Sequence, residues 1–322
     1  MSRDADAASA LWRAAVAARG AGGGNAAAAV VGVGREVLIE TARGTLCALR
    51  CGDPAGPKVL ALHGWLDNAA SFIPLQSALS SFDLVALDLP GHGASAHRAP
   101  GYDYVFVDWI HDVLDVLDAL GWPQAMLLGH SMGGAIASMV AAAVPERVTR
   151  LALIEALGPV SGKASDAGDR LRKAVPARRA LRGERQARVI PTLEQAVKQR
   201  LAVSSMAAEA AQLIVARNLR ALPGGFAWRS DPRLTLPGHM RTDEAVILDW
   251  LRHIECPTLV IAADPAPVYF PPETRTTRLA QLRDVRLEVI SGGHHLHMEQ
   301  PERVGPLLRE FLNGTGSAAL AD

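Results

Sequence analysis

Short, continuous apolar runs recur along the chain, and each ends in glycine, proline or an acidic residue. They are KVLALHG at 58–64, FDLVALDLPGHG at 82–93, AMLLGHSMGG at 125–134, LALIEALGP at 151–159, PTLVIAAD at 257–264 and VRLEVISGG at 285–293. An uninterrupted apolar run of this length is typical of a strand that is covered on both faces of a parallel sheet. The stretches at 36–44 and 45–52 instead predict an antiparallel pair that opens the sheet.

Helical patterns separate these strands. Residues 103–120 carry apolar side chains at helical spacing, and further helices are expected at 134–143 and from Pro301 onward. Strands that alternate with helices predict an α/β fold, with a doubly wound, mostly parallel sheet.

Residues 160–253 break this alternation. They show no strand pattern but contain helical patterns at 170–188, 192–203 and 243–253. We interpret 160–253 as a helical lid inserted into a core formed by 35–159 and 254–313. The Ala/Gly-rich stretch 1–34, with a short helix at 11–19, is expected to be a loosely ordered extension, and 314–322 a tail.

Charge and cysteine content exclude several classes of protein. The 33 basic and 33 acidic residues cancel, so no electrostatic argument favours nucleic acid or an anionic membrane. Three cysteines are too few for a disulfide framework, and no apolar run is long enough to span a bilayer. Because charged residues interrupt the start of the chain, no secretory signal is predicted, and a cytoplasmic protein is expected. Whether the chain forms a homodimer stays open.

The sequence Gly129-His130-Ser131-Met132-Gly133 lies between a predicted buried strand and a predicted helix. In that context G-x-S-x-G is typical of a sharp turn that lifts a nucleophilic serine off the sheet. The helix that follows adds partial positive charge where an oxyanion would form. We therefore predict Ser131 as a nucleophile.

A general base for Ser131 must come from the same carboxyl edge of the sheet. The loop after the last strand holds three histidines, and His294, directly after two glycines, is the best candidate. His295 and His297 are expected to pack on the loop or line the pocket. His63, Asp88 and His92, in two other loops, are expected to be structural.

Several motifs together resemble the α/β-hydrolase superfamily, in particular its serine hydrolase-like branch. They are HGWLDNAASF, DLPGHGAS, GHSMGG, GGHHLHMEQPERV and the W-R-x-D-P-R pattern at 228–233. The resemblance implies that Ser131 and His294 are catalytic and that the Trp65 and Met132 amides donate to the oxyanion. Relatives that cleave carbon–halogen bonds or epoxides carry aspartate as the nucleophile, so serine argues against both reactions.

The carboxylate that would orient His294, the third member of a catalytic triad with Ser131, departs from the family pattern. Family members usually carry the acid a few residues past the strand at 257–262, where this chain has Ala266. Asp264, two residues early, and Glu155, at the end of the strand after the nucleophile helix, are both candidates. We favour Glu155, because the Pro265-Ala266-Pro267 run is too stiff to shift Asp264 into place.

These residues predict a serine hydrolase that cleaves a small-molecule carboxylic ester through an acyl-enzyme intermediate, with no cofactor and no metal. A carbon–carbon bond hydrolase of the same fold, and a ligand-binding member without turnover, are the alternatives. A metal-dependent hydrolase is a further rival, with His294, His295, His297 and Glu299 as its ligands.

Overall fold

The computed structural model describes residues 34–181 and 188–315, so the helix expected at 11–19 and most of the two predicted terminal segments lie outside the described residues. Its strands are β1 (Arg35–Thr41), β2 (Gly44–Gly52), β3 (Lys58–Leu62), β4 (Asp83–Asp88), β5 (Ala125–His130), β6 (Val148–Ile154), β7 (Leu219–Leu222), β8 (Gly225–Trp228), β9 (Thr258–Asp264) and β10 (Val285–Ser291). Each of the six apolar runs in the sequence contains one strand.

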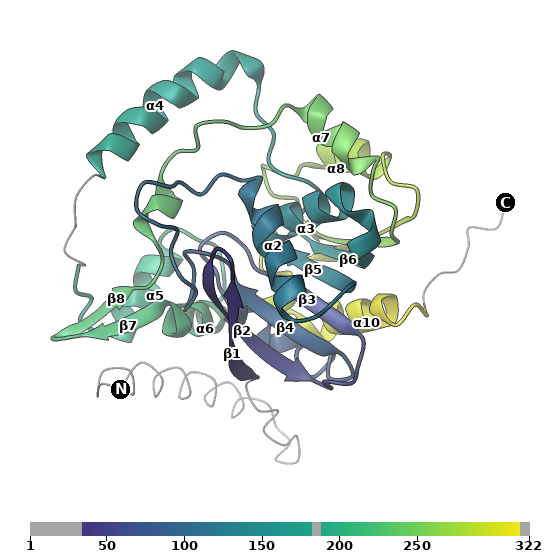
Figure 1. Ribbon diagram of the computed structural model, residues 1–322, viewed down its shortest axis with the longest axis horizontal. Coiled ribbons are helices and arrows are strands. Elements are labelled where there is room, and N and C mark those ends of the chain that lie inside the picture. Colours follow the sequence, from purple (N-terminus) through teal and green to yellow (C-terminus); the bar gives the residue numbers. More distant parts are fainter. Residues whose placement is uncertain (1–33, 182–187, 316–322) are drawn as a thin grey trace.

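Eight of these strands form one sheet in the order β1-β2-β4-β3-β5-β6-β9-β10 (Figure 1). β2 pairs antiparallel with both β1 and β4. The other strands of the sheet, β4, β3, β5, β6, β9 and β10, are parallel to one another. The predicted fold class, an α/β fold with a mostly parallel sheet, is confirmed. Because β5, β6, β9 and β10 are neighbours, the loops at their carboxyl ends meet at one edge.

The central strands are mostly apolar because their alternate residues feed two cores, one on each face of the sheet. In β3, for example, Leu60 and Leu62 pack into one core, while Val59 and Ala61 pack into the other. β4, β5, β6 and β9 divide in the same way. The sheet is therefore rigid behind the edge that carries the loops. β10, at the edge of the sheet, buries only Ile290, which corrects the expectation that 285–293 forms a strand covered on both faces.

The helices are α2 (Asp108–Ala119), α3 (Met132–Ala143), α4 (Ala167–Ala180), α5 (Leu193–Leu201), α6 (Ala208–Asn218), α7 (Glu244–Leu251), α8 (Pro272–Leu279), α9 (Leu296–Glu299) and α10 (Pro301–Leu312). Side chains of α2, α3 and α7 belong to one core, and those of α10 and the 3-10 helix η1 (Ala69–Leu75) to the other. α3 begins directly after Ser131, two residues earlier than the sequence pattern predicts.

The inserted segment is not wholly helical, which corrects the sequence interpretation. β7 and β8 form an antiparallel hairpin within it, closed between Leu222 and Gly225. Four-residue strands are too short to display an alternating pattern, and Pro223 and Gly224 form the turn between them.

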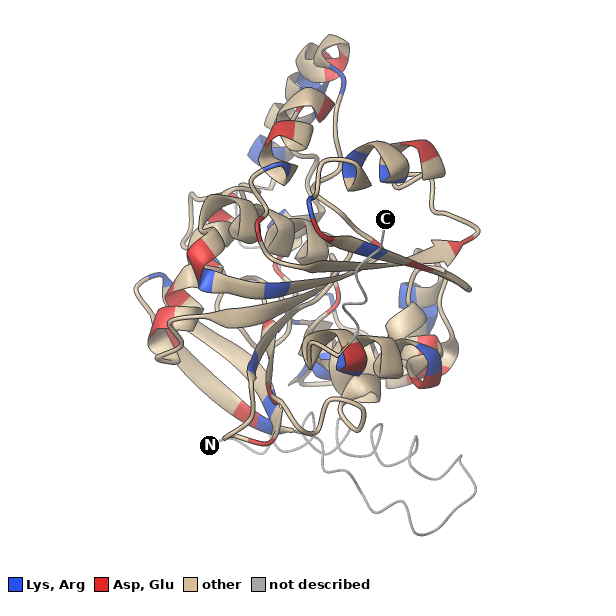
Figure 2. Cartoon of the chain, turned by 90° about the vertical axis from the view of Figure 1, so that its right-hand side faces the viewer, with Lys and Arg blue, Asp and Glu red and all other residues tan. Residues whose placement is uncertain are grey.

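The two ends of this segment differ in burial. α4 projects from the rest of the structure in Figures 1 and 2, and Ala174 is its one buried residue among those described. α6, by contrast, buries most of its length, from Ala210 to Asn218. In Figure 2 basic and acidic positions are mixed along α4 and the other outer helices, in line with the balanced charge of the chain.

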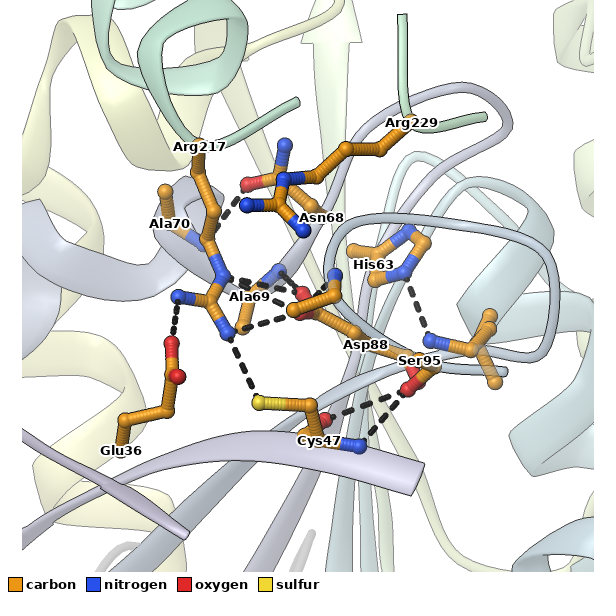
Figure 3. Close-up of polar contacts among 12 residues, drawn as sticks. Glu36, Cys47, His63, Asn68, Ala69, Ala70, Asp88, Ser95, Arg217 and Arg229 are labelled. Atoms are coloured by element: carbon orange, nitrogen blue, oxygen red, sulfur yellow. Dashed lines mark hydrogen bonds and ion pairs between the residues drawn. The ribbon is translucent and has the colours of Figure 1, made fainter. Parts of the chain in front are cut away.

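A buried ion pair ties α6 to the core (Figure 3). The Arg217 guanidinium lies 2.7 Å from Asp88 Oδ2 and also contacts Glu36 and Cys47. Asp88 in turn accepts hydrogen bonds from the Ala69 and Ala94 amides, and although burial alone would raise its pKa, Arg217 holds that pKa below its usual range. Asp88 is thus structural, as expected.

The W-R-x-D-P-R motif makes a second link between lid and core. The Asp231 amide donates to the Gly91 carbonyl at 2.8 Å, and Asp231 Oδ2 accepts from the Tyr104 hydroxyl at 2.9 Å. Arg233 pairs with Asp231 and donates to carbonyls of the 98–102 loop. The base of the lid is therefore fixed to the loop that follows β4.

Candidate active site

Ser131 occupies a strained turn between β5 and α3. Its φ of 50° and ψ of −115° are costly for a residue with a side chain, and its amide donates to the Ile154 carbonyl at 2.9 Å. A Cβ on Gly133 would lie 2.0 Å from the Leu62 carbonyl oxygen, and one on Gly129 would lie 2.5 Å from the Gly134 Cα. The two glycines are thus required for the close approach of α3 to β3 and β5.

His294 follows β10, and its ring lies against Glu155 from the end of β6. His294 Nδ1 is 3.3 Å from Glu155 Oε2. The other oxygen, Oε1, accepts from the Ala263 amide at 2.5 Å, so the side chain reaches across the end of β9. Glu155 is 1% exposed and has a φ of 59°, and its amide donates to the Ile261 carbonyl. The carboxylate is therefore held rigidly.

Burial lowers the pKa of His294 below its ordinary value, while the hydrogen bond that the ring donates to Glu155 acts in the opposite direction. The imidazole is consequently neutral at pH 7, which is the state a general base needs.

Asp264 does not reach His294. It ends β9 with an exposed side chain, and its backbone carbonyl accepts from the Gly292 amide at 3.0 Å. Within the described residues, Glu155 and not Asp264 is the carboxylate that contacts the imidazole.

Tyr269, which the sequence interpretation missed, lies between the serine and the histidine. Its hydroxyl is 2.5 Å from His294 Nδ1 and 3.1 Å from Nε2, and it also hydrogen-bonds Ser131. Although the ring is partly exposed, desolvation of the hydroxyl, together with the nearby Glu155 charge, raises the pKa of Tyr269. The hydroxyl is therefore neutral, and it contacts both Ser131 and His294.

The two predicted oxyanion donors lie on loops that the structure brings together. Met132 is the first residue of α3, and Trp65 lies in the loop after β3. Gly133 of α3 packs against the end of β3. Neither backbone amide has a protein acceptor among the described residues, whereas the Trp65 indole donates to the Leu234 carbonyl of the lid at 3.0 Å. Both amides are available to an external oxygen.

A cluster of buried histidines lies behind this edge. His130 Nε2 is 2.9 Å from the His294 carbonyl oxygen, and the rings of His295 and His297 pack against the His130 ring. Asp67, from the β3 loop, faces His130 and His295 and pairs with Arg200 of α5 at 2.6 Å. No local sequence pattern predicts this cluster, because its members come from four separate segments.

The ligand set of the metal-hydrolase rival does not converge. Glu299 Oε1 accepts from the Ala207 amide at 2.7 Å, and His297 packs against Phe72. The expected structural role of His63 fits its contacts, since its Nε2 accepts from the Leu89 amide and its Nδ1 lies 2.7 Å from the Gly64 carbonyl.

The chain belongs to the alpha/beta hydrolase fold family, whose model matches residues 57–301. Among curated proteins it is 31% identical to a serine hydrolase-like protein of Dictyostelium discoideum, over 87% of this chain and 82% of that protein. It is 30% identical to a serine hydrolase-like protein of Danio rerio, over 81% of this chain and 83% of that protein. Among solved structures it is similar to a hypothetical protein of Pseudomonas aeruginosa, with 42% identity, a TM-score of 0.80, and 86% and 98% of the two chains covered. The predicted superfamily and branch are confirmed.

Proposed function

We propose that this protein is a serine hydrolase that cleaves carboxylic esters through an acyl-enzyme intermediate. The observation that carries the proposal is the strained Ser131 turn at the sheet edge where Glu155 holds His294. Backbone strain of this size persists only where the surrounding structure enforces it, and such strain concentrates at functional sites.

In the proposed reaction, Ser131 Oγ attacks the ester carbonyl while His294 takes the hydroxyl proton, and the amides of Trp65 and Met132 stabilise the oxyanion. Protonated His294 then gives its proton to the departing alcohol, which leaves an acyl group on Ser131. Water, deprotonated by His294, attacks this acyl group and releases the carboxylic acid. Glu155 keeps the imidazole in the required tautomer throughout.

Tyr269 must move for this reaction to proceed, because its hydroxyl lies between the two reacting side chains. Its loop is suited to movement, since the preceding residue, Val268, is almost fully exposed. With Tyr269 displaced, the exposed faces of Trp65 and Val268 would contact the substrate. An ester with small to medium apolar groups is the substrate class that fits these side chains.

A fluorophosphonate probe tests the nucleophile directly. Wild-type protein should gain the mass of one phosphonyl group, the probe less HF, because fluoride leaves as the Ser131 oxygen bonds to phosphorus, and Ser131→Ala should abolish the gain. Ser165→Ala, which changes an exposed serine of the lid, is the matched control and should be labelled normally. Labelling that survives in Ser131→Ala would refute the assignment.

The base is tested with p-nitrophenyl esters of increasing acyl length. His294→Ala should lower kcat at least about a thousandfold. The control, His111→Ala, changes an exposed histidine of α2 and should leave kcat unchanged. Absence of turnover on every ester, with intact probe labelling, would favour the carbon–carbon bond alternative.

A further inference from the structure

Three possible metal ligands meet in the buried cluster behind the proposed active site. Asp67, His130 and His295 are buried, and their ligand atoms all lie within 4.8 Å of one another. Asp67 Oδ2 is 3.6 Å from His130 Nδ1 and 3.4 Å from His295 Nε2. Both distances are longer than those of good hydrogen bonds, so the direct pairing of Asp67 with the two rings is loose.

The protonation of His130 is set by its other nitrogen. Nε2 faces the His294 carbonyl oxygen at 2.9 Å, and because a carbonyl only accepts, Nε2 carries the proton. In a neutral ring the Nδ1 lone pair is then left beside the Asp67 carboxylate, and Nδ1 has no hydrogen-bond partner among the described residues. A lone pair next to an anionic oxygen, both out of contact with water, is unfavourable, and either a proton on Nδ1 or a metal ion between the two atoms relieves it.

A metal ion fits this space. Tetrahedral zinc has bonds of about 2.0–2.1 Å to nitrogen and oxygen, which places neighbouring ligand atoms about 3.3 Å apart. The distances of 3.6 and 3.4 Å from Asp67 Oδ2 to the two histidine nitrogens are close to this ligand–ligand separation. A Cβ on Gly64 would lie 2.9 Å from both Asp67 Oδ2 and His130 Nδ1, so the glycine keeps this position open.

The neighbours of the three ligands orient them. Arg200 holds Asp67 Oδ1 at 2.6 Å, which leaves Oδ2 directed at the histidines. The His294 carbonyl fixes the tautomer of His130, as a backbone carbonyl commonly does for a metal-binding histidine. The Arg200 charge repels a cation and therefore limits the affinity.

We propose that Asp67, His130 and His295 bind one divalent transition-metal ion of the Zn²⁺ class, with a fourth position open to an exchangeable ligand. Imidazole and carboxylate together select this class over Mg²⁺ or Ca²⁺, which prefer oxygen alone. The site departs from the sequence expectation of no metal and uses a different set from His294, His295, His297 and Glu299. Its occupancy does not depend on the proposed hydrolase activity.

The test is titration of the full-length, chelator-treated protein with Zn²⁺ by calorimetry, and with Co²⁺ by visible absorption, which reports tetrahedral coordination. Wild type should bind one ion. Asp67→Asn and His295→Gln should each weaken binding by more than about tenfold, and the second variant keeps the Asp67–Arg200 pair that supports the fold.

Two controls locate the ion. His111→Gln changes an exposed histidine and should bind normally. His294→Gln removes the proposed catalytic base but keeps the carbonyl that contacts His130, and it should also bind normally. Equal affinity in wild type, Asp67→Asn and His295→Gln, or no binding by wild type, would overturn the proposal, while loss in His294→Gln would assign the ion to the active site instead.

Discussion

At the scale of single residues, the identity of the carboxylate beside the histidine determines how the active site is built. Glu155 reaches His294 because its strand, β6, lies between β5 and β9, and its longer side chain crosses the end of β9 to the Ala263 amide. Asp264 ends β9 itself but points to solvent. In the proposed active site, a carboxylate on the strand next to the one that carries Ser131 therefore takes the place of one in the more usual loop.

Isosteric substitutions compare the two carboxylates. Glu155→Gln should lower kcat by about ten-thousandfold, as the equivalent change does in the serine protease triad, while Asp264→Asn should retain near-normal kcat. Both are measured on one good ester. A large loss in Asp264→Asn with normal turnover in Glu155→Gln would reverse the assignment.

The pH profile of the same variants gives a second measurement. Burial lowers the pKa of His294, so kcat/KM of wild type should fall on the acid side with a midpoint below the ordinary histidine value of about 6.5. Because Glu155 raises that pKa, Glu155→Gln should move the midpoint to still lower pH. An unchanged midpoint would show that Glu155 does not act on the imidazole.

Tyr269 competes with Ser131 for the imidazole in the structure. Tyr269→Phe keeps the ring but removes the hydroxyl that contacts His294 and Ser131. One hydrogen bond is worth about 0.5–1.5 kcal/mol net, so fluorophosphonate labelling of Ser131 should become about 2- to 10-fold faster. Tyr102→Phe, at an exposed tyrosine, is the control. Slower labelling in Tyr269→Phe would mean that the hydroxyl assists the reaction.

At the scale of elements, the inserted segment divides into an anchored part and a projecting part. α6 is held by Arg217 and by burial along its length, and the W-R-x-D-P-R motif joins the 98–102 loop. α4 has little packing of its own. These contacts therefore argue against a lid in which residues 160–253 move as one body.

Hydrogen exchange tests this division. Backbone amides of α4 should exchange much faster than those of α6, because local opening of α4 exposes little apolar surface and breaks no buried ion pair. β3 and β5 supply the slow reference within the same experiment. Equal exchange rates in α4 and α6 would contradict this division and would favour the interpretation of 160–253 as a single lid.

At the scale of the whole molecule, several histidines are buried in the neutral state. Burial lowers the pKa of His63 and His297, and lowers that of His92 to about 3. Above pH about 6.5 these groups are neutral in both the folded and the unfolded chain. Below it the unfolded chain takes up protons that the folded chain does not, so stability falls as the pH falls.

The free energy of unfolding should accordingly drop between pH 6.5 and 4.5, by about 1.4 kcal/mol per pH unit for each such histidine. Urea denaturation at a series of pH values measures the slope. His92→Gln should reduce the slope, and His111→Gln, at an exposed position, should not. The pKa values of Asp67 and Asp88 are lowered in the folded chain, so these two carboxylates change the free energy of unfolding only below pH about 3.8, where the unfolded chain begins to protonate them. A slope that is the same in His92→Gln and wild type would contradict the assignment of His92.

The sequence by itself determined the features that local patterns encode. Apolar runs predicted the central buried strands, because a strand covered on both faces has few polar positions, whereas the run at 285–293 forms the mostly unburied edge strand β10. The glycines around Ser131 predicted the turn, because only glycine permits the close approach there. The position of His294 followed from the rule that parallel strands bring their carboxyl ends to one edge.

Only the tertiary structure decided which side chains meet across that edge. The contact of Glu155 with His294 depends on the order of β5, β6, β9 and β10, and the Tyr269 hydroxyl arrives from a loop whose path no periodicity describes. The Asp67, His130 and His295 cluster joins segments far apart in the chain. Such contacts are set by the packing of whole elements, whereas a sequence pattern reports only whether each position is buried.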